Sequence, residues 1–198
     1  MKQSIKNNIG QIFLIVFSVF LGLYLNNRVE DVKDKKEASK LLSKIKSELN
    51  ENKKLLDSWV PYHGEIIKSL DSLSSSEIFI KDFKKDKSEI YNAFNRGTIM
   101  SDMPAADTWD IAKSHPIILN FEYDELLSLS KIYNQQKFTY ESIPKLIELM
   151  LSNEFNSEEN AQKNLHLFKD KLRDVYSREI QLINYYNNAE KILKYESK

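Results

Sequence analysis

The sequence predicts an all-α protein, with a transmembrane helix near the N-terminus followed by a soluble, bundle-like helical domain. Three observations lead to this fold class. Residues 9–25 form an apolar run without any charge, apolar residues recur at helical spacing in most of the remaining chain, and the 198 residues include only 4 glycines and 4 prolines. So few turn-forming residues disfavour the many tight turns of a β-sandwich.

The apolar run has the composition of a membrane anchor. Its sequence, IGQIFLIVFSVFLGLYL, reaches the lower end of the range of about 17–25 residues that span a hydrocarbon core. A cleaved signal peptide would have a shorter apolar core and small residues at the cleavage site, whereas this run ends in Leu-Tyr-Leu-Asn-Asn-Arg. A buried core helix would expose a broader polar face, whereas this run contains no charge and only Gln11 and Ser18 in it are strongly polar. We therefore divide the chain into a tail (residues 1–8), a transmembrane helix (9–26), a juxtamembrane amphipathic helix (27–60) and a helical soluble domain (61–198).

The basic residues around the anchor give opposing indications of its orientation. Lys2 and Lys6, in a tail without acids, favour a cytoplasmic N-terminus, as in a signal anchor that exports the rest of the chain. The segment after the anchor has more basic residues, which favours a cytoplasmic domain by the same rule: Arg28, Lys33, Lys35, Lys36 and Lys40. We expect export, and therefore a single-pass protein of a bacterial inner membrane with a periplasmic domain.

One face of the anchor carries polar and small residues. Gln11, Ser18, Gly22 and Asn26 are spaced by 7, 4 and 4 residues, so a helix places them on the same side. The pair Ser18 and Gly22 is a small-xxx-small motif that allows another helix to approach closely, and Gln11 can form a hydrogen bond across the contact. This face predicts packing against a partner helix or a second copy. Chance remains the alternative, since glycine and serine are common in membrane helices.

The segment after the anchor is charged and has helical periodicity. No glycine or proline interrupts residues 23–60, so we expect the anchor helix to continue as one long rod until Pro61 ends or kinks it. The apolar positions of this segment are not strictly those of a coiled coil, which favours packing within the domain. These positions are Ala38, Leu41, Leu42, Ile45, Leu49, Leu56, Trp59 and Val60.

We expect an all-α domain of five or six helices. Residues 66–73 continue the helical pattern to a serine-rich turn, residues 78–80 can form a short strand, and residues 86–94 look helical before Gly97. A helix near Pro104 precedes a longer one that Asn120 would cap, with a kink at Pro144. The last helix opens at Ser157, and its expected apolar face contains Leu165, Phe168, Leu172, Val175, Ile180, Ile183, Tyr186, Ile192 and Leu193.

The composition excludes several kinds of chemistry. The chain has no cysteine, so disulfides, thiolate catalysis and cysteine-ligated metals are excluded. Its 29 basic and 29 acidic residues balance, which argues against nucleic acid as a partner. The three histidines are isolated, although His166 and Asp170 have the i, i+4 spacing of a ligand pair. We predict no cofactor, no metal and no enzymatic activity.

Two local clusters remain as candidate sites. Trp109, Tyr123 and Tyr133 can line an aromatic pocket, although such residues more often pack in the core of a helical bundle. Three acids near Trp109 can act as general acid and base, although such acids more often cap helices: Asp102, Asp107 and Asp110.

Two stretches resemble an uncharacterised family of small membrane proteins of Bacteroidota. The first is IGQIFLIVFSVFLGLYLNNR with the charged helix that follows, where Leu25-Asn26-Asn27 match a Leu-Asn-Asn-Trp-like signature and Arg28 stands in place of the usual tryptophan. The second is DTWDIAKSHPIILNFEYDELLSLSKIYNQQ, which is similar to the central helix pair of that family. The resemblance covers roughly two-thirds of the chain. It implies a membrane-anchored helical domain and supplies no catalytic residue.

Three functional hypotheses follow. The first is a membrane-anchored interaction or scaffold protein, with the bilayer and a protein partner or second copy as its contacts. The second is a membrane-tethered ligand-binding domain that uses the aromatic pocket. The third is a hydrolase based on the three acids.

Overall fold

The computed structural model describes the backbone of residues 2–155 and 157–194, and the side chains of this part except those of residues 2–12, 190, 192 and 194. All regular secondary structure in the described part is helical, which confirms the all-α fold class. The α-helices are α1 (Lys2–Ser74), α2 (Glu77–Lys85), α3 (Asp107–Ser114), α4 (Tyr123–Tyr140), α5 (Ser142–Leu151) and α6 (Ala161–Lys194). Two 3-10 helices are η1 (Lys87–Ala93) and η2 (Pro116–Asn120).

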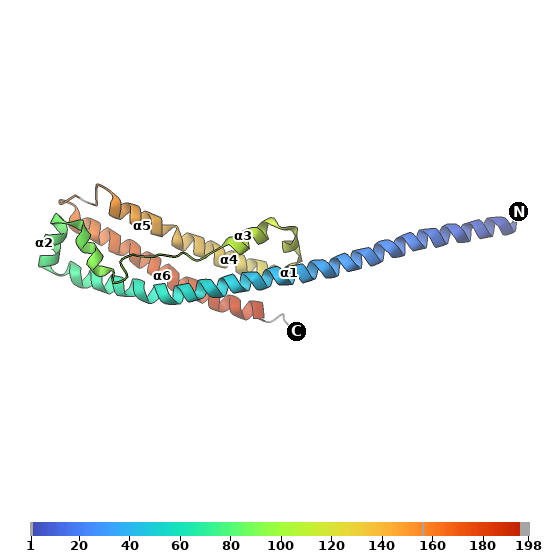
Figure 1. Ribbon diagram of the computed structural model, residues 1–198, viewed down its shortest axis with the longest axis horizontal. Coiled ribbons are helices and arrows are strands. Elements are labelled where there is room, and N and C mark those ends of the chain that lie inside the picture. Colours follow the sequence, from blue (N-terminus) through green and yellow to red (C-terminus); the bar gives the residue numbers. More distant parts are fainter. Residues whose placement is uncertain (1, 156, 195–198) are drawn as a thin grey trace.

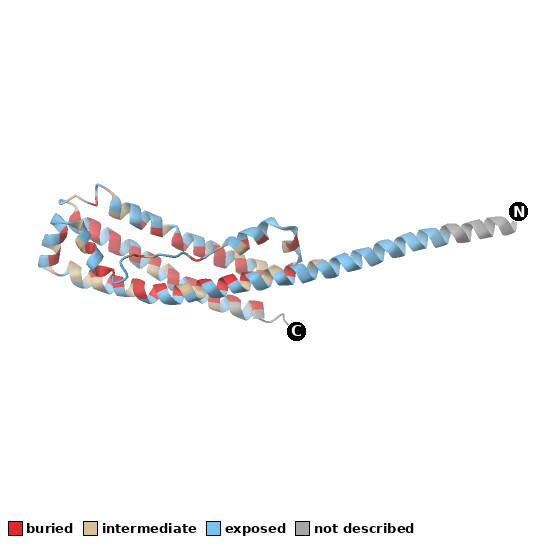
Figure 2. Ribbon diagram, in the orientation of Figure 1, coloured by how far each residue is buried: buried red, intermediate tan, exposed pale blue. Residues whose placement is uncertain are grey.

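Helix α1 is 73 residues long and has two different halves. Its N-terminal half projects far beyond the rest of the molecule, and its C-terminal half is one of the long helices of the bundle (Figure 1). Residues 13–33 are exposed throughout, whereas buried residues recur from Ala38 onward (Figure 2). We call residues 13–37 the rod.

Pro61 was expected to end or kink the long helix, but α1 continues through it to Ser74. The residues on both sides of it, Val60 and Tyr62, are buried in the bundle, so tertiary packing holds both parts in one helix. Pro61 and Asp57 are both exposed, so water can hydrate the Asp57 carbonyl, which has no helical N–H partner at position 61.

The bundle consists of α1, the consecutive helices α4 and α5, and α6. Helix α6 packs against α1, α4 and α5, while α3 and η2 pack against α1 at the end nearer the rod (Figure 1). The expected buried face of α6 is found at Leu165, Phe168, Leu172 and Val175, but Ile180 is exposed because Glu179 occupies the inward position. Ile192 lies outside the residues whose side chains are described.

Residues 78–80 belong to α2, so the strand prediction was wrong. Ser76 caps this helix by accepting a hydrogen bond from the Phe79 backbone N–H. A helix also places Phe79 and Phe83 on one side, where their rings stack with centroids 5.8 Å apart and both are buried. Burial of these two rings decides between helix and strand for a short apolar sequence.

The start of α4 also differs from expectation. Asn120 is the last residue of η2, and Glu122 precedes the first turn of α4 instead. The Glu122 backbone N–H donates to the Glu125 carboxylate at 3.3 Å, which is one half of a capping box. Pro144 lies in the first turn of α5, just after the break at Glu141 between α4 and α5.

Candidate functional site

The rod is exposed throughout residues 13–33, although its first part is apolar. The large apolar side chains between Phe13 and Leu25 are 45–68% exposed, and no described part of the chain covers them. By length and composition this is the one segment in the described helices that can cross a membrane, and a signal sequence near the N-terminus has the same properties. The segment thus requires an apolar environment that the bundle does not provide.

The predicted packing face of the anchor has no intramolecular partner where it is described. The Ser18 hydroxyl donates to the Leu14 carbonyl of its own helix at 2.8 Å. A Cβ atom added at Gly22 would meet nothing within 4 Å, and Asn26 is exposed. The side chain of Gln11 lies outside the described residues.

Two of the three predicted pocket aromatics meet. Trp109 on α3 and Tyr133 on α4 stack with ring centroids 5.4 Å apart and an interplanar angle of 6°, and both are buried. They line a cavity of about 270 Å³ together with Tyr140 and Lys137. Tyr123 is 75% exposed at the start of α4 and is not part of this lining.

Tyr133 also helps to hold the start of α3. Its hydroxyl donates to Glu48 Oε1 on α1 at 2.6 Å, and the Thr108 backbone N–H donates to Glu48 Oε2 at 2.8 Å. Burial and the nearby Glu48 carboxylate raise the pKa of Tyr133 above its ordinary value, so its hydroxyl stays a donor. Trp109 and Tyr133 therefore pack α3 against α4 and α1, and they also form part of the cavity lining.

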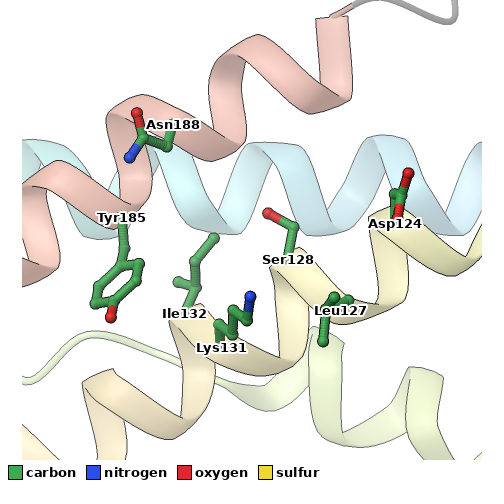
Figure 3. Close-up of a pocket in the computed structure, with 7 residues that line it drawn as sticks. All are labelled: Asp124, Leu127, Ser128, Lys131, Ile132, Tyr185 and Asn188. Atoms are coloured by element: carbon green, nitrogen blue, oxygen red, sulfur yellow. The ribbon is translucent and has the colours of Figure 1, made fainter.

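A second groove lies between α4 and α6. It has a volume of about 320 Å³, with Ile132 and Ser128 from α4 facing Tyr185 and Asn188 from α6 (Figure 3). Asp124 and Lys131 place one charge of each sign in its lining. This volume is at the lower end of the range of small-molecule sites.

Sequence reasoning missed a buried polar network that holds the segment between η1 and α3. This segment, residues 94–106, runs along the bundle without regular secondary structure, and we call it the strap (Figure 1). Asn52 donates to the Ala105 carbonyl at 2.7 Å and accepts from the Ala105 N–H at 2.8 Å. Gln136 donates to the carbonyls of Pro104 and Ala105 and accepts from the Tyr186 hydroxyl. The network replaces the backbone hydrogen bonds that a strap outside any helix cannot form itself.

A second missed feature is a fully buried pair of titratable groups. His63 Nδ1 on α1 lies 2.7 Å from Glu179 Oε2 on α6, and neither side chain has any exposed surface. His63 Nε2 lies 3.0 Å from the Ile99 carbonyl of the strap, which can only accept, so this nitrogen carries a hydrogen. One proton is then shared between imidazole and carboxylate, and the pair is neutral as a whole. The two partners are 116 positions apart, so no local signal in the sequence links them.

The remaining candidate residues lie on the exposed surface. Asp102 accepts from Ser101, Asp110 pairs with Lys113, and Asp107 opens α3. Asp170 pairs with Arg173 at 3.6 Å, and its expected partner His166 is exposed. Among the described residues, no three histidine or acidic side chains are placed to hold a metal ion.

Comparison with known proteins gives no relative: no family model, no curated protein and no solved structure matches the chain. The resemblance to the Bacteroidota family therefore stays a prediction.

Proposed function

We propose that this protein is a membrane-anchored interaction module, in which α1 fixes a helical bundle at the surface of a bacterial inner membrane. The observation that carries the proposal is the exposed apolar part of the rod. Burying large apolar side chains contributes about 1.5–3 kcal/mol each, so leaving Phe13, Phe17 and Phe20 in water is strongly unfavourable. A bilayer removes this cost over the length of one helix.

The continuity of α1 supports a scaffold role. A single helix runs from the apolar segment into the bundle, so the two parts are joined without a flexible linker. A bundle fixed in this way presents its surfaces at a defined height and orientation relative to the bilayer. We place the bundle on the periplasmic side, because the basic tail before the apolar segment contains no acidic residue, as in an exporting anchor; the basic residues from Arg28 to Lys40 favour the opposite side by the same rule.

Topology reporters test both parts of this proposal. A reporter active only outside the cytoplasm, fused after Lys198, should be active, and the chain should stay in the membrane after alkaline carbonate extraction. Release by carbonate would contradict anchoring. An inactive reporter together with membrane retention would reverse the orientation and leave the anchor in place.

The interaction role has a separate test. A photo-crosslinking residue at Gly22 should give discrete crosslinked products in native membranes, while one at exposed Lys171 on α6 serves as the control. Absence of any product, with no self-oligomer, would contradict the interaction role.

A second candidate function is ligand binding by the bundle. The stacked Trp109 and Tyr133 at the cavity of about 270 Å³ favour it. At least one compound of a metabolite library should then raise the melting temperature of the native chain. The same compound should not raise that of Trp109→Leu, provided that this variant is as fully folded as the native chain. No shift with any compound would contradict it.

A further inference from the structure

The part of the rod between the apolar segment and the bundle has an unexplained pair of apolar residues. Between Asn26 and Glu37, where the side chains are predominantly polar or charged, the apolar residues are Val29 and Val32. They are 70% and 67% exposed. Two exposed valines separated by three residues on a charged helix lie on the same side of it.

These valines continue the small-residue face of the anchor. Ser18, Gly22, Leu25, Val29 and Val32 follow one another at spacings of 4, 3, 4 and 3 residues, and we call them the heptad stripe. Alternation of three and four is the spacing at which one helix packs along another in a coiled coil. The stripe therefore runs unbroken from the membrane segment into the segment outside it.

The heptad stripe faces away from the bundle. Nine residues, or about two and a half helical turns, separate Val29 from Ala38, the first buried residue of α1, so the two lie on opposite sides. Gly22 precedes Ala38 by sixteen positions, or about four and a half turns, so Gly22 also lies on the side opposite to Ala38. A helix can thus approach the stripe along its whole length without meeting the bundle.

Charge is segregated around this stripe. With about 100° per residue, the five basic residues from Arg28 to Lys40 lie within about 90° of the midpoint between Val29 and Val32. The acidic residues of this segment lie beyond about 100° from it, on the side of the bundle: Glu30, Asp31, Asp34 and Glu37. The stripe is therefore flanked by positive charge, which favours an acidic occupant.

A second copy does not fit this charge pattern. In a parallel pair, Arg28 of one copy would lie beside Lys33 of the other, and Lys35 beside Lys40. Like charges at these flanking positions destabilise the pair. Acidic lipids fit less well too, because Lys36 stands about 15 Å along the helix beyond Asn26, whereas the headgroup layer is about 5–8 Å thick. Lipid headgroups would also leave the two valines uncovered.

We propose that the heptad stripe binds a membrane-spanning helix of another protein, which continues outside the bilayer as an acidic amphipathic helix. This rests on the proposed anchoring of α1 and names the partner class for it. Ser18 and Gly22 provide close approach within the membrane. Val29 and Val32 provide the apolar contact outside it, and the flanking lysines pair with the partner's carboxylates.

Reconstitution with designed probes tests this directly. The full chain, which has no native cysteine, is labelled at an introduced Ser43→Cys on the exposed side of α1 and placed in phosphatidylcholine vesicles. Energy transfer is measured to two synthetic single-pass peptides with the same apolar sequence and the same heptad valines. The peptides differ only in having glutamate or lysine at the flanking positions of the external segment.

The expected result is energy transfer to the acidic peptide, at least about tenfold weaker transfer to the basic one, and less transfer between copies of the chain. Gly22→Ile should weaken binding of the acidic peptide about tenfold. Because no described residue outside this stretch of α1 lies within 4 Å of a Cβ at this position, the fold itself should not respond. Lys33→Glu with Lys36→Glu should weaken it similarly, and the matched control Lys163→Glu with Lys171→Glu on exposed parts of α6 should not.

Other outcomes would overturn the inference. Equal transfer to both peptides, or stronger transfer between copies, would show that charge does not select the partner. Phosphatidylglycerol is also added to the vesicles without peptide. A change in the fluorescence of the label that Lys33→Glu with Lys36→Glu abolishes would show that the basic residues bind lipid headgroups and not a partner helix. A chain that does not float with the vesicles would contradict anchoring as well, whereas flotation without transfer contradicts this inference alone.

Discussion

The two halves of α1 share one backbone helix and differ in what their side chains require. In the rod, the apolar residues are exposed on every side, and no described residue outside the helix contacts the Gly22 position. In the bundle half, Ile45, Leu56 and Ile66 are fully buried on one side. Backbone hydrogen bonding continues through both halves, so the difference teaches that side-chain pattern, not helicity, decides the environment of each half. The apolar side chains of the bundle half are buried by other helices of the chain, whereas those of the rod are not.

Breaking the buried pair should have the largest effect on the bundle. His63→Phe leaves the Glu179 carboxylate buried without its partner, which costs about 3–5 kcal/mol of unfolding free energy. Urea titration of the full chain in detergent, followed by circular dichroism, measures this loss. His63→Phe combined with Glu179→Leu should recover most of it, because both polar groups are then gone. A double variant as unstable as the single one would show that packing, not the unpaired charge, causes the loss.

Releasing the strap should have the next largest effect. Gln136→Leu removes the donor to the Pro104 and Ala105 carbonyls and the acceptor of the Tyr186 hydroxyl, at a cost of about 2–3 kcal/mol. Hydrogen exchange should accelerate most in residues 98–108. The control Gln162→Leu replaces an exposed glutamine of α6 and should change neither quantity. Uniform acceleration over the whole bundle would contradict a local role for Gln136.

Pro61 offers a stabilising change. Pro61→Ala restores the helical N–H that the Asp57 carbonyl lacks, and should raise the unfolding free energy by about 1 kcal/mol. A rise in melting temperature checks this. A lower melting temperature would mean that the proline ring or its rigidity stabilises the native helix.

Acid should weaken one surface contact between α1 and α6. Hydrogen bonds from Lys169, and then Arg173, hold the pKa of Asp71 below its ordinary value of 3.8. The contribution of Asp71 is therefore fully present above the unfolded pKa and is lost as pH falls from about 4 through the lower folded pKa. Because the carboxylate is 43% exposed, we expect less than about 1 kcal/mol. Asp71→Asn should be less stable than the native chain at pH 7 and equally stable near pH 2, and a constant difference would contradict this linkage.

The smallest effect separates the two halves of α1 most sharply. Gly22→Ile in the rod should leave the unfolding free energy of the bundle unchanged within about 0.5 kcal/mol. Gly64→Ile in the same helix should cost about 1–3 kcal/mol, since its Cβ would already lie 3.4 Å from the Tyr176 ring and a larger side chain would have to displace that ring. Equal losses for the two variants would mean that the rod contributes to the bundle.

By itself the sequence determined the fold class, the apolar segment and the uninterrupted course of the long helix as far as residue 60, because these follow from local composition and helical periodicity. Local rules failed where tertiary packing opposed them, as at Pro61 and at residues 78–80. At Asn120 they chose the wrong local cap, because Glu122 with Glu125 starts α4 instead. They also could not find contacts between residues far apart in the chain. Tertiary structure alone decided that His63 meets Glu179 and that Asn52 and Gln136 hold the strap, since no spacing rule links residues 31 to 116 positions apart. It also decided that Trp109 and Tyr133 stack while Tyr123 faces solvent, because which side of each helix turns inward is fixed only when the helices pack.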